Sequence, residues 1–432
     1  MSNPAGLRYF MPDWGDSVDP GYDFIQDSFS PDRDVSKDSY AHELFSGRPY
    51  DGILVSRAVV EKATSSYKRL AQHGAHSHYR LLPNMEVFGD CGAFEYVNEY
   101  LPRYDTEDVL EYYEAIGVDY GASVDHLVVN SIYVSEPATD GSMAGRRRKV
   151  IMSEVECQRR VELTLENAQR FLTLHKRRRY TFVPVGVAQG WTAATYSASV
   201  RALARMGYRY IALGGLARSP STVIMDVLQA AARTADECAP NRVRFHLFGV
   251  AKLGLVGRLR HYAVASIDSA SYLRKAWLRS GQNYLTIEGE WYTAIRVPQS
   301  SHPKVRAYIA QNGKSLAEVQ SQEQHCLRML ERYDRGGLSP EEVERLLDAI
   351  VNYDMYLLRL GDDGQSLRDK SVSREKYRHT LLAKPWRACT CEICRALGIH
   401  VVIFRGTNRN KRRGFHNTWA FYQRLKLGAG SK

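Results

Sequence analysis

Three cysteines and one histidine near the C-terminus have the residue types and spacing of metal ligands. Cys389, Cys391 and Cys394 form a C-x-C-x2-C run, and His416 follows 22 residues after the last thiol. Three thiolates and one imidazole are the four donors that a closed tetrahedral zinc site requires. A site whose four positions are all filled by protein has no place for a substrate water. We therefore predict a structural Zn²⁺ that stabilises the fold, and we expect the reactive groups elsewhere in the chain.

A second set of polar residues follows short apolar runs that are predicted to be strands. The set consists of Asp90, Asp125, Gln189, Asp268 and the run Gly214-Gly215-Leu216. One such aspartate alone is more often a helix N-cap or a turn residue. Three of them at strand ends of one barrel would converge on its C-terminal rim. Together they suit a reaction that needs a carboxylate nucleophile, an acid/base group and polar readers of a planar ligand.

The elements that must position these residues alternate between strand and helix from about residue 50 to 285. Apolar runs predict strands at 52–56, 85–89, 120–124, 181–188, 210–213, 244–249 and 263–267. Amphipathic patterns between them predict helices, notably at 106–116, 154–174, 192–206 and 222–238. Repeated strand–helix units require parallel strands, and seven or eight of them favour a closed (β/α)8 TIM barrel over an open sheet.

We therefore expect an α/β chain of three parts. Residues 1–50 would form an N-terminal extension, residues 51–300 the barrel, and residues 301–432 a C-terminal part that completes it. The last part would combine a helical insertion with the zinc-binding subdomain, because helical patterns precede the cysteines at 303–360 and follow them at 415–425. Residues 137–145, rich in Gly, Ser and Asp, predict a surface loop.

Composition indicates a globular chain with a polyanionic partner. The formal net charge is +11, and there are three basic runs, Arg146–Lys149, Lys176–Arg179 and Lys411–Arg413. A single run is usually a solvated face, but three on so basic a chain favour nucleic-acid binding. The N-terminus has no signal-peptide pattern and no apolar stretch approaches 18 residues. We therefore expect a cytoplasmic protein without a membrane partner.

Several of these residues lie in runs that resemble the motifs of the tRNA-guanine transglycosylase superfamily. Residues 89–94 are similar to its D-S-G-G-F element, 186–190 to G-x-x-Q-G, 212–217 to I-G-G-L-A and 267–272 to F-D-S-A-S-Y. The cysteine run with His416 and Asn417 has the superfamily's C-x-C-x2-C…H-N form. The motifs occur in this order, and the resemblance covers about residues 80 to 425.

Within the superfamily, the chain most resembles the DNA-guanine transglycosylases, which place 7-deazaguanines in DNA. The opening run Phe10–Asp16 and the run Lys384-Pro385-Trp386 are similar to that branch. The C-V-x-P-T-R run of the queuine enzymes is missing, and nothing after residue 425 resembles the RNA-binding domain of archaeal relatives. Three departures from the motifs lie beside the reacting positions: Cys91 for Ser, Ala93 for Gly and Ile267 for Phe.

The resemblance implies a double displacement on a target guanosine. Asp268 would attack C1′, expel guanine and hold the sugar as a covalent ester. Asp90 would act as general base and deprotonate the incoming base, which then displaces Asp268. Base exchange conserves the glycosidic bond energy, so the only cofactor expected is the structural Zn²⁺.

The resemblance also implies which residues bind the purine. Its polar edge would be read by Asp125, Gln189 and backbone groups near Gly214, Gly215 and Leu216. Phe94 and Phe248 would sandwich the ring, where stacking is worth about 1–3 kcal/mol per base. Core packing would explain these two phenylalanines about equally well.

The leading hypothesis is an enzyme that exchanges guanine in DNA for a 7-deazaguanine, with 7-cyano-7-deazaguanine (preQ0) as the expected base. The same chemistry on tRNA is the first alternative, because barrel motifs read the base and not the 2′-hydroxyl. A non-catalytic nucleic-acid-binding subunit is the second, and the presence of both Asp90 and Asp268 argues against it. A zinc hydrolase fits least, because the metal set is closed. The target sequence, the oligomeric state and the need for a partner protein that opens the duplex stay open.

Overall fold

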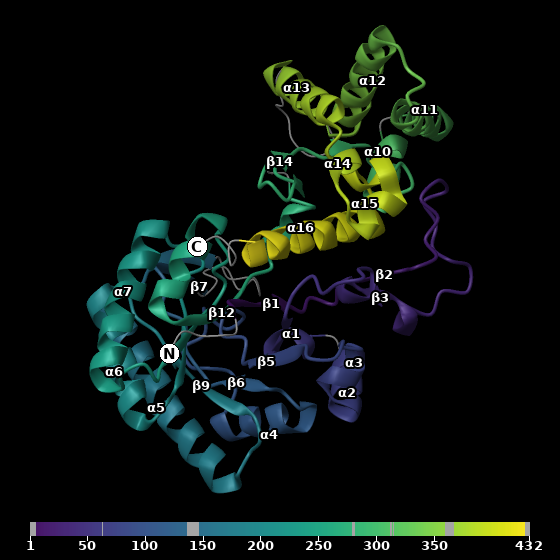
Figure 1. The fold of residues 1–432 in the computed structure, drawn as a ribbon. Coiled ribbons are helices and arrows are strands. Elements are labelled where there is room, and N and C mark those ends of the chain that lie inside the picture. The colour runs from purple at the N-terminus through teal and green to yellow at the C-terminus, as the bar shows by residue number, and fades with distance from the viewer. Residues whose placement is uncertain are drawn as a thin grey trace, which may run out of the picture. The chain divides into compact units, whose positions relative to one another are not determined.

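The structure is a computed structural model that describes residues 6–62, 64–135, 147–278, 281–311, 313, 315–358 and 367–427. The chain forms two compact units, coloured by residue number in Figure 1. The first comprises residues 1–15, 50–270 and 425–432, and the second comprises residues 16–49 and 271–424.

The first unit is built on a closed barrel of eight parallel strands, in the order β1-β12-β11-β10-β9-β6-β5-β4. The strands are β1 (Arg8–Pro12), β4 (Gly52–Ser56), β5 (Glu86–Asp90), β6 (Tyr120–Ala122), β9 (Val183–Ala188), β10 (Tyr210–Leu213), β11 (Arg244–Leu247) and β12 (Val264–Asp268). The predicted (β/α)8 barrel is confirmed. All seven predicted strands are present, with ends that move by at most two residues.

The eighth strand comes from the N-terminal segment. β1 pairs with β12 on one side and β4 on the other, so that Phe10 lies opposite both Asp268 and Gly52. The side chains of Tyr9 and Phe10 are completely buried. The barrel therefore begins at Arg8, well before the predicted boundary at residue 51.

Helices form the outer layer of this unit, as Figure 1 shows for α4 to α7 around the strands. They are α1 (Arg57–Val60), α2 (Thr64–His73), α3 (Ala75–His78), α4 (Thr106–Ile116), α5 (Glu154–Arg178), α6 (Ala193–Met206), α7 (Ser221–Cys238) and α8 (Val256–Leu259). Local signals set their ends. Asp105 caps α4 by accepting from the N–H of Glu107, and Ser153 caps α5 by accepting from Glu156.

The barrel interior is filled by side chains and is not a pore. One cluster of buried residues contains Phe10, Leu54, Phe88, Ala122, Val185, Val187, Tyr210, Ala212 and Ala265. These residues come from seven of the eight barrel strands, which is how the lumen of a small parallel barrel is packed. The rigid interior holds the strand ends, and therefore the residues that follow them, in fixed positions.

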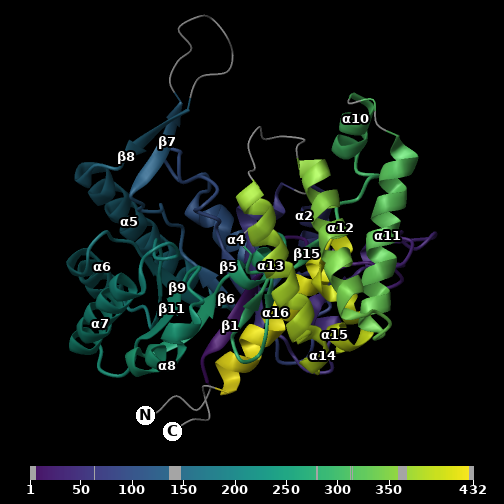
Figure 2. The same ribbon diagram turned by 90° about the horizontal axis from the view of Figure 1, so that it is seen from above.

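A two-stranded antiparallel ribbon is inserted between β6 and α5. It consists of β7 (Ser131–Ser135) and β8 (Arg147–Ile151), and Figure 2 shows it projecting from the barrel unit. The sequence did not predict these strands. The loop predicted at 137–145 lies outside the described residues.

The second unit contains the predicted helical and cysteine-bearing segments. Its helices are α9 (Ser271–Lys275), α10 (Pro303–Gln311), α11 (Leu316–Asp334), α12 (Pro340–Leu358), α13 (Leu367–Ala383), α14 (Pro385–Ala388), α15 (Glu392–Leu397) and α16 (Thr407–Leu427), whose last three residues belong to the first unit. Its short strands are β2 (Ser17–Val18), β3 (Ser39–Tyr40), β13 (Tyr284–Leu285), β14 (Trp291–Tyr292), β15 (Ile295–Arg296) and β16 (Ile403–Phe404). Among the described residues of the whole chain, no helix has the length and apolar character needed to cross a membrane.

Candidate active site

The predicted carboxylates lie at one end of the barrel. Asp90 is the last residue of β5, Asp268 is the last residue of β12, and Asp125 follows β6 by three residues. Because the barrel strands are parallel, these residues lie at its carboxyl-terminal end, where the catalytic groups of such barrels gather. Burial raises the pKa of Asp90, and the negative charges of Asp125 and Asp268 raise it further. The three side chains therefore share one electrostatic environment.

Asp90 is held by hydrogen bonds to its ionised form. The hydroxyl of Ser56, its register partner on β4, donates one hydrogen bond, and the N–H of Gly92 donates another. Gly92 has a φ of +87°, and a Cβ there would stand 2.5 Å from the Cβ of Ala58, so only glycine fits. Burial, followed by the charge of Asp125, nevertheless raises the pKa of Asp90 to about 7. A carboxyl group with this pKa can both donate and accept a proton near neutral pH.

Asp125 and Gln189 form a buried polar pair. Nε2 of Gln189 donates to Oδ2 of Asp125 at 2.6 Å, and the thiol of Cys91 donates to Oδ1 at 3.3 Å. The N–H of Val128 donates to Oε1 of Gln189 at 3.3 Å, which fixes the orientation of the amide. Burial raises the pKa of Asp125 to about 6. At pH 7 it is therefore mostly ionised and acts as a hydrogen-bond acceptor.

The glycine pair after β10 lies directly against this amide. A Cβ on Gly214 would stand 2.2 Å from Nε2 of Gln189, so a side chain at this position would displace the amide. The hydroxyl of Tyr196 donates to the carbonyl of Gly214 at 2.6 Å, and Leu216 is buried. The backbone of the Gly214-Gly215-Leu216 run thus lies next to the Asp125–Gln189 pair, and its role in reading the ligand stays a prediction.

Asp268 is buried and is anchored through one of its two oxygens. Oδ1 accepts hydrogen bonds from Nε2 of His246 at 3.1 Å and from the N–H of Gly249 at 2.9 Å. Oδ2 accepts no hydrogen bond from any residue that the structure describes. A carboxylate with one oxygen fixed and the other unengaged has the arrangement expected of an oriented nucleophile.

His246 links Asp268 to the interior of the barrel. Its Nδ1 lies 2.6 Å from Oγ of Ser266, which is also hydrogen-bonded to the hydroxyl of Tyr210. A carboxylate only accepts, so Nε2 of His246 carries the proton and Nδ1 accepts from Ser266. Burial lowers the pKa of His246, which favours this neutral ring. The ring packs against Phe88 and Phe248, with centroids 4.4 Å and 4.6 Å away.

No role is predicted for His246 from the sequence. The apolar run at 244–249 predicts a strand, but it does not by itself show which side chains of that strand point inward. The signal that could have identified His246 is the alternation of side chains along a strand. It directs His246 and Phe248 to one side of the strand and Phe245 and Leu247 to the other. His246 therefore shares a face with Phe248, which was predicted to be a site residue.

The two predicted stacking rings have different surroundings. Phe94 is 58% exposed, and the guanidinium of Arg218 lies 5.7 Å from its ring centroid. Phe248 is partly buried and packs edge-on against Phe88 at 5.9 Å. Phe248 thus contributes to the packing of the barrel, whereas Phe94 is open to solvent. The purine sandwich stays a prediction.

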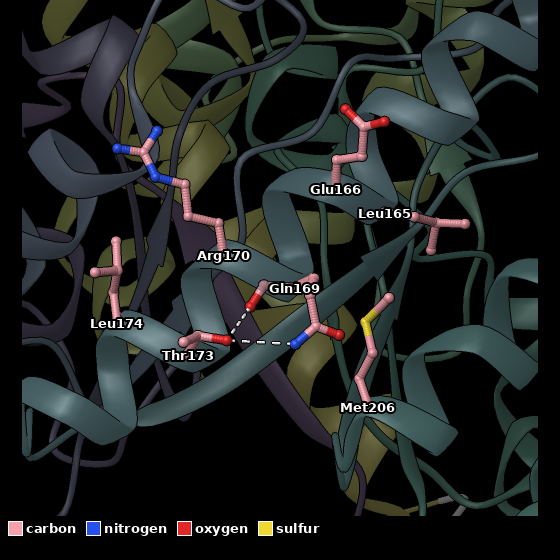
Figure 3. A pocket seen from close by; sticks show the side chains of 7 residues that line it. All are labelled: Leu165, Glu166, Gln169, Arg170, Thr173, Leu174 and Met206. Atoms are coloured by element: carbon pink, nitrogen blue, oxygen red, sulfur yellow. Dashed lines mark hydrogen bonds between the residues drawn. The ribbon is translucent and has the colours of Figure 1, made fainter.

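A surface hollow of the barrel unit lies away from these residues (Figure 3). It has a volume of 520 Å³ and is lined by Leu165, Glu166, Gln169, Arg170, Thr173, Leu174 and Met206. All of these residues belong to α5 or to the last position of α6, in the outer helical layer. None of the predicted site residues lines the hollow, so we place the candidate active site at the strand ends.

The four predicted metal ligands converge within the second unit. Nδ1 of His416 lies 3.4 Å from Sγ of Cys391, 3.4 Å from Sγ of Cys394 and 3.8 Å from Sγ of Cys389. The four donor atoms all lie within 4.8 Å of one another. Bonds of about 2.3 Å from zinc to sulfur and about 2.0 Å to nitrogen produce tetrahedral edges of roughly 3.5–3.8 Å. The cluster can therefore hold a metal ion.

Neighbouring groups orient these ligands. Nε2 of His416 lies 2.8 Å from the carbonyl of Leu285 and donates to it, which leaves Nδ1 unprotonated and directed at the sulfurs. The N–H of Cys394 donates to Sγ of Cys391 at 3.4 Å. Asn417 accepts from the N–H of Leu285 at 2.9 Å and donates to the carbonyl of Asn283 at 2.8 Å, so α16 is fastened to the segment around β13.

The chain has a curated relative over nearly its whole length. No protein-family profile matches the chain. A protein of Salmonella montevideo, named DNA-guanine transglycosylase, is 36% identical over 433 residues, which cover 97% of this chain and 97% of the relative. The chain belongs to the DNA-guanine transglycosylase family and is a transferase with guanine transglycosylase activity.

Proposed function

We propose that this enzyme replaces guanine in DNA with a 7-deazaguanine base, and that preQ0 is the incoming base. The observation that carries the proposal is the arrangement of Asp268, which is anchored through Oδ1 and has Oδ2 unengaged. DNA as the substrate is supported by the name of the relative and by the net charge of +11. The mechanism is a double displacement in which Asp268 and Asp90 have different roles.

In the first half-reaction, Oδ2 of Asp268 attacks C1′ of the target nucleotide. A C1′–O bond forms, the C1′–N9 bond breaks, and the bonding electrons leave with guanine. The proton that guanine takes up at N9 comes from the carboxyl of Asp90, whose pKa of about 7 keeps about half of it protonated at neutral pH. His246 and Gly249 hold Oδ1, so the attacking oxygen is already oriented.

In the second half-reaction, Asp90 accepts the N9 proton of the incoming base. N9 then attacks C1′, the ester C–O bond breaks, and Asp268 returns as a carboxylate. The proton given to guanine is recovered from the new base, so no net proton, metal or redox equivalent is consumed. The same residue acts as acid and then as base, as microscopic reversibility requires for two mirror-image steps.

Asp125 and Gln189 are suited to bind both bases in turn. Guanine and 7-deazaguanines carry the same edge, with N–H donors at N1 and the 2-amino group beside the O6 acceptor. An ionised Asp125 accepts from the donors, and the amide of Gln189 donates to O6. The two bases differ only at position 7 and its substituent. Other groups must therefore distinguish the two bases. The backbone at Gly214, Gly215 and Leu216 is a candidate, because it is adjacent to the Asp125–Gln189 pair.

The metal at Cys389, Cys391, Cys394 and His416 is proposed to be Zn²⁺ with a structural role. All four of its positions are filled by protein donors, so a bound zinc ion would link α14, α15 and α16 and would leave no position for substrate.

The proposal is tested by incubating the enzyme with labelled preQ0 and matched single-stranded, bubble and duplex DNA, with tRNA at the same salt concentration. We expect label in DNA, fastest where the target guanine is unpaired, because extrusion from a duplex costs a few kcal/mol. Asp268→Asn should show neither exchange nor a denaturation-resistant protein–DNA adduct, because an amide cannot form the glycosyl ester. Labelling of tRNA without labelling of any DNA would replace the proposal with the tRNA activity.

A further inference from the structure

The three basic runs have different positions in the structure. In Lys411–Arg413, Arg412 and Arg413 are buried and donate to backbone carbonyls of the same unit, so they stabilise the fold. Lys176–Arg179 ends α5 four residues before β9 begins, which places it at the end of the barrel where the strands start. Arg178 in that run is paired with Glu107 and Glu111. The Lys176–Arg179 run therefore does not lie at the carboxyl-terminal end of the barrel.

The described part of the remaining run lies on the ribbon. Residues 147–149 belong to β8, and the ribbon follows β6, the strand that leads to Asp125. Ser131 is six positions after Asp125 in the chain, a reach of at most about 22 Å for an extended chain. The ribbon therefore rises from the same end of the barrel that holds Asp90, Asp125 and Asp268.

The base of the ribbon is fixed to the barrel unit. Ile132 packs against a cluster formed by Val128, Met152, Cys157 and Val161. The N–H of Met152 donates to the carbonyl of Asn130 at 3.1 Å, and the N–H of Tyr133 donates to Oδ1 of Asn98 at 2.8 Å. These contacts hold the base of the ribbon in a defined position on the barrel unit.

One face of the ribbon carries the residue types that bind nucleic acid. Tyr133 lies opposite Lys149 in the antiparallel register, so both side chains project from the same face, and both are exposed. On that face Ile151 is 83% exposed and Tyr133 is 51% exposed. Leaving such large apolar groups in water costs free energy. Exposed aromatic and apolar side chains next to a basic run are typical of surfaces that contact bases and phosphates together.

We propose that the ribbon of β7 and β8 is a DNA-binding arm that enters the major groove beside the target guanine. A two-stranded ribbon has the width that this groove admits. Lys149 contacts a backbone phosphate, and Tyr133 and Ile151 lie against the base edges. The inference rests on the proposed function, because it assumes that the partner is DNA. It adds the element that holds the duplex while Asp268 acts.

The test compares Lys149→Ala with Lys176→Ala in the full-length enzyme. Both substitutions remove one exposed lysine from a basic run, but Lys176 lies at the opposite end of the barrel. Duplex binding is measured by titration at several salt concentrations. We expect Lys149→Ala to make the slope of log K against log[salt] less steep by about 0.9, the value for one phosphate contact, and Lys176→Ala to leave it unchanged.

Groove choice is tested by competition. Methyl green, which occupies the major groove, should inhibit duplex binding by the wild type, and netropsin, which occupies the minor groove, should inhibit it much less. Tyr133→Ala should lower duplex affinity several-fold with an unchanged melting temperature, because the ring is exposed.

Equal salt slopes in the two lysine variants, or inhibition by netropsin alone, would overturn the proposed arm. Such results would leave exchange on DNA intact. Absence of exchange on every DNA form would instead count against the proposed function, so the two failures can be told apart.

Discussion

The two half-reactions are predicted to respond to pH in opposite directions. In the proposed mechanism, release of guanine needs Asp90 protonated, and capture of the incoming base needs it ionised. Because the pKa of Asp90 is about 7, about nine-tenths of it is protonated at pH 6 and about a tenth at pH 8. Adduct formation should therefore fall about tenfold for each pH unit above 7.5. Base capture should fall as the pH is lowered.

Formation of the covalent intermediate is itself expected to change the pKa of Asp90. The charge of Asp268 is one of the causes that raise the pKa of Asp90, and formation of the ester removes that charge. The pKa of Asp90 in the adduct should then lie below 7. The residue is thereby shifted toward its base form at the step that needs a base.

The assay separates the two steps in single turnover. Enzyme and labelled oligonucleotide are mixed without an incoming base, quenched at intervals, and the adduct is measured by denaturing electrophoresis from pH 5.5 to 9. Preformed adduct is then mixed with preQ0 over the same range. Parallel pH profiles, or an apparent pKa for capture that is higher than the pKa for adduct formation, would refute the assignment of both steps to Asp90.

A matched pair of variants identifies the source of the shift. Asp125→Asn removes the charge that contributes most after burial, so the profile of adduct formation should move to lower pH whatever happens to its amplitude. Glu86→Gln removes a carboxylate from the other end of the same strand, and it should leave the position of the profile unchanged.

Two further predictions concern the support of the sites. His246→Phe should retain the ring packing but remove one of the two donors to Oδ1 of Asp268. Adduct formation should therefore slow by about tenfold or more, while the dissociation constant for preQ0 stays within about twofold. Equal losses in both quantities would show that His246 supports the whole site and not the nucleophile. Cys391→Ser should lower the bound zinc to well under one ion per chain and decrease the melting temperature, because structural zinc binding is coupled to folding. Metal analysis that finds no zinc in folded wild-type protein would contradict the assignment.

Features of the chain with a strong periodic or spacing signal could be predicted from the sequence. Seven barrel strands and α4, α6 and α7 were placed within two residues, because apolar runs and helical periodicity alternate clearly there. The metal cluster followed from ligand type and spacing alone. Asp90 and Asp268 were expected at strand ends, and they are the last residues of β5 and β12; their catalytic roles stay predictions.

The features that the sequence did not predict depend on contacts between residues that are far apart in the sequence. β1 is five residues long and far from its partners, so nothing in its neighbourhood marks it as a barrel strand. Arg412 and Arg413 look like surface cations, but their guanidinium groups are satisfied by carbonyls such as those of Asp19 and Val401, which no local pattern brings together. The ribbon was missed because its second strand, Arg147–Ile151, is dominated by basic residues and lacks the apolar alternation of a typical strand.

The position of β1 also has a consequence for synthesis on the ribosome. Phe10 pairs with Asp268, so the first barrel strand to be synthesised cannot complete its pairing until the last barrel strand has been synthesised. At about 5–20 residues per second, the roughly 250 intervening residues take on the order of 10–50 s to add. Until then the nascent barrel has an unpaired strand edge, and Tyr9 and Phe10 lack the neighbours that bury them, which is a situation that favours aggregation. Slower or cooler expression, which lowers the number of unfinished chains present at one time, should therefore increase the yield of active enzyme.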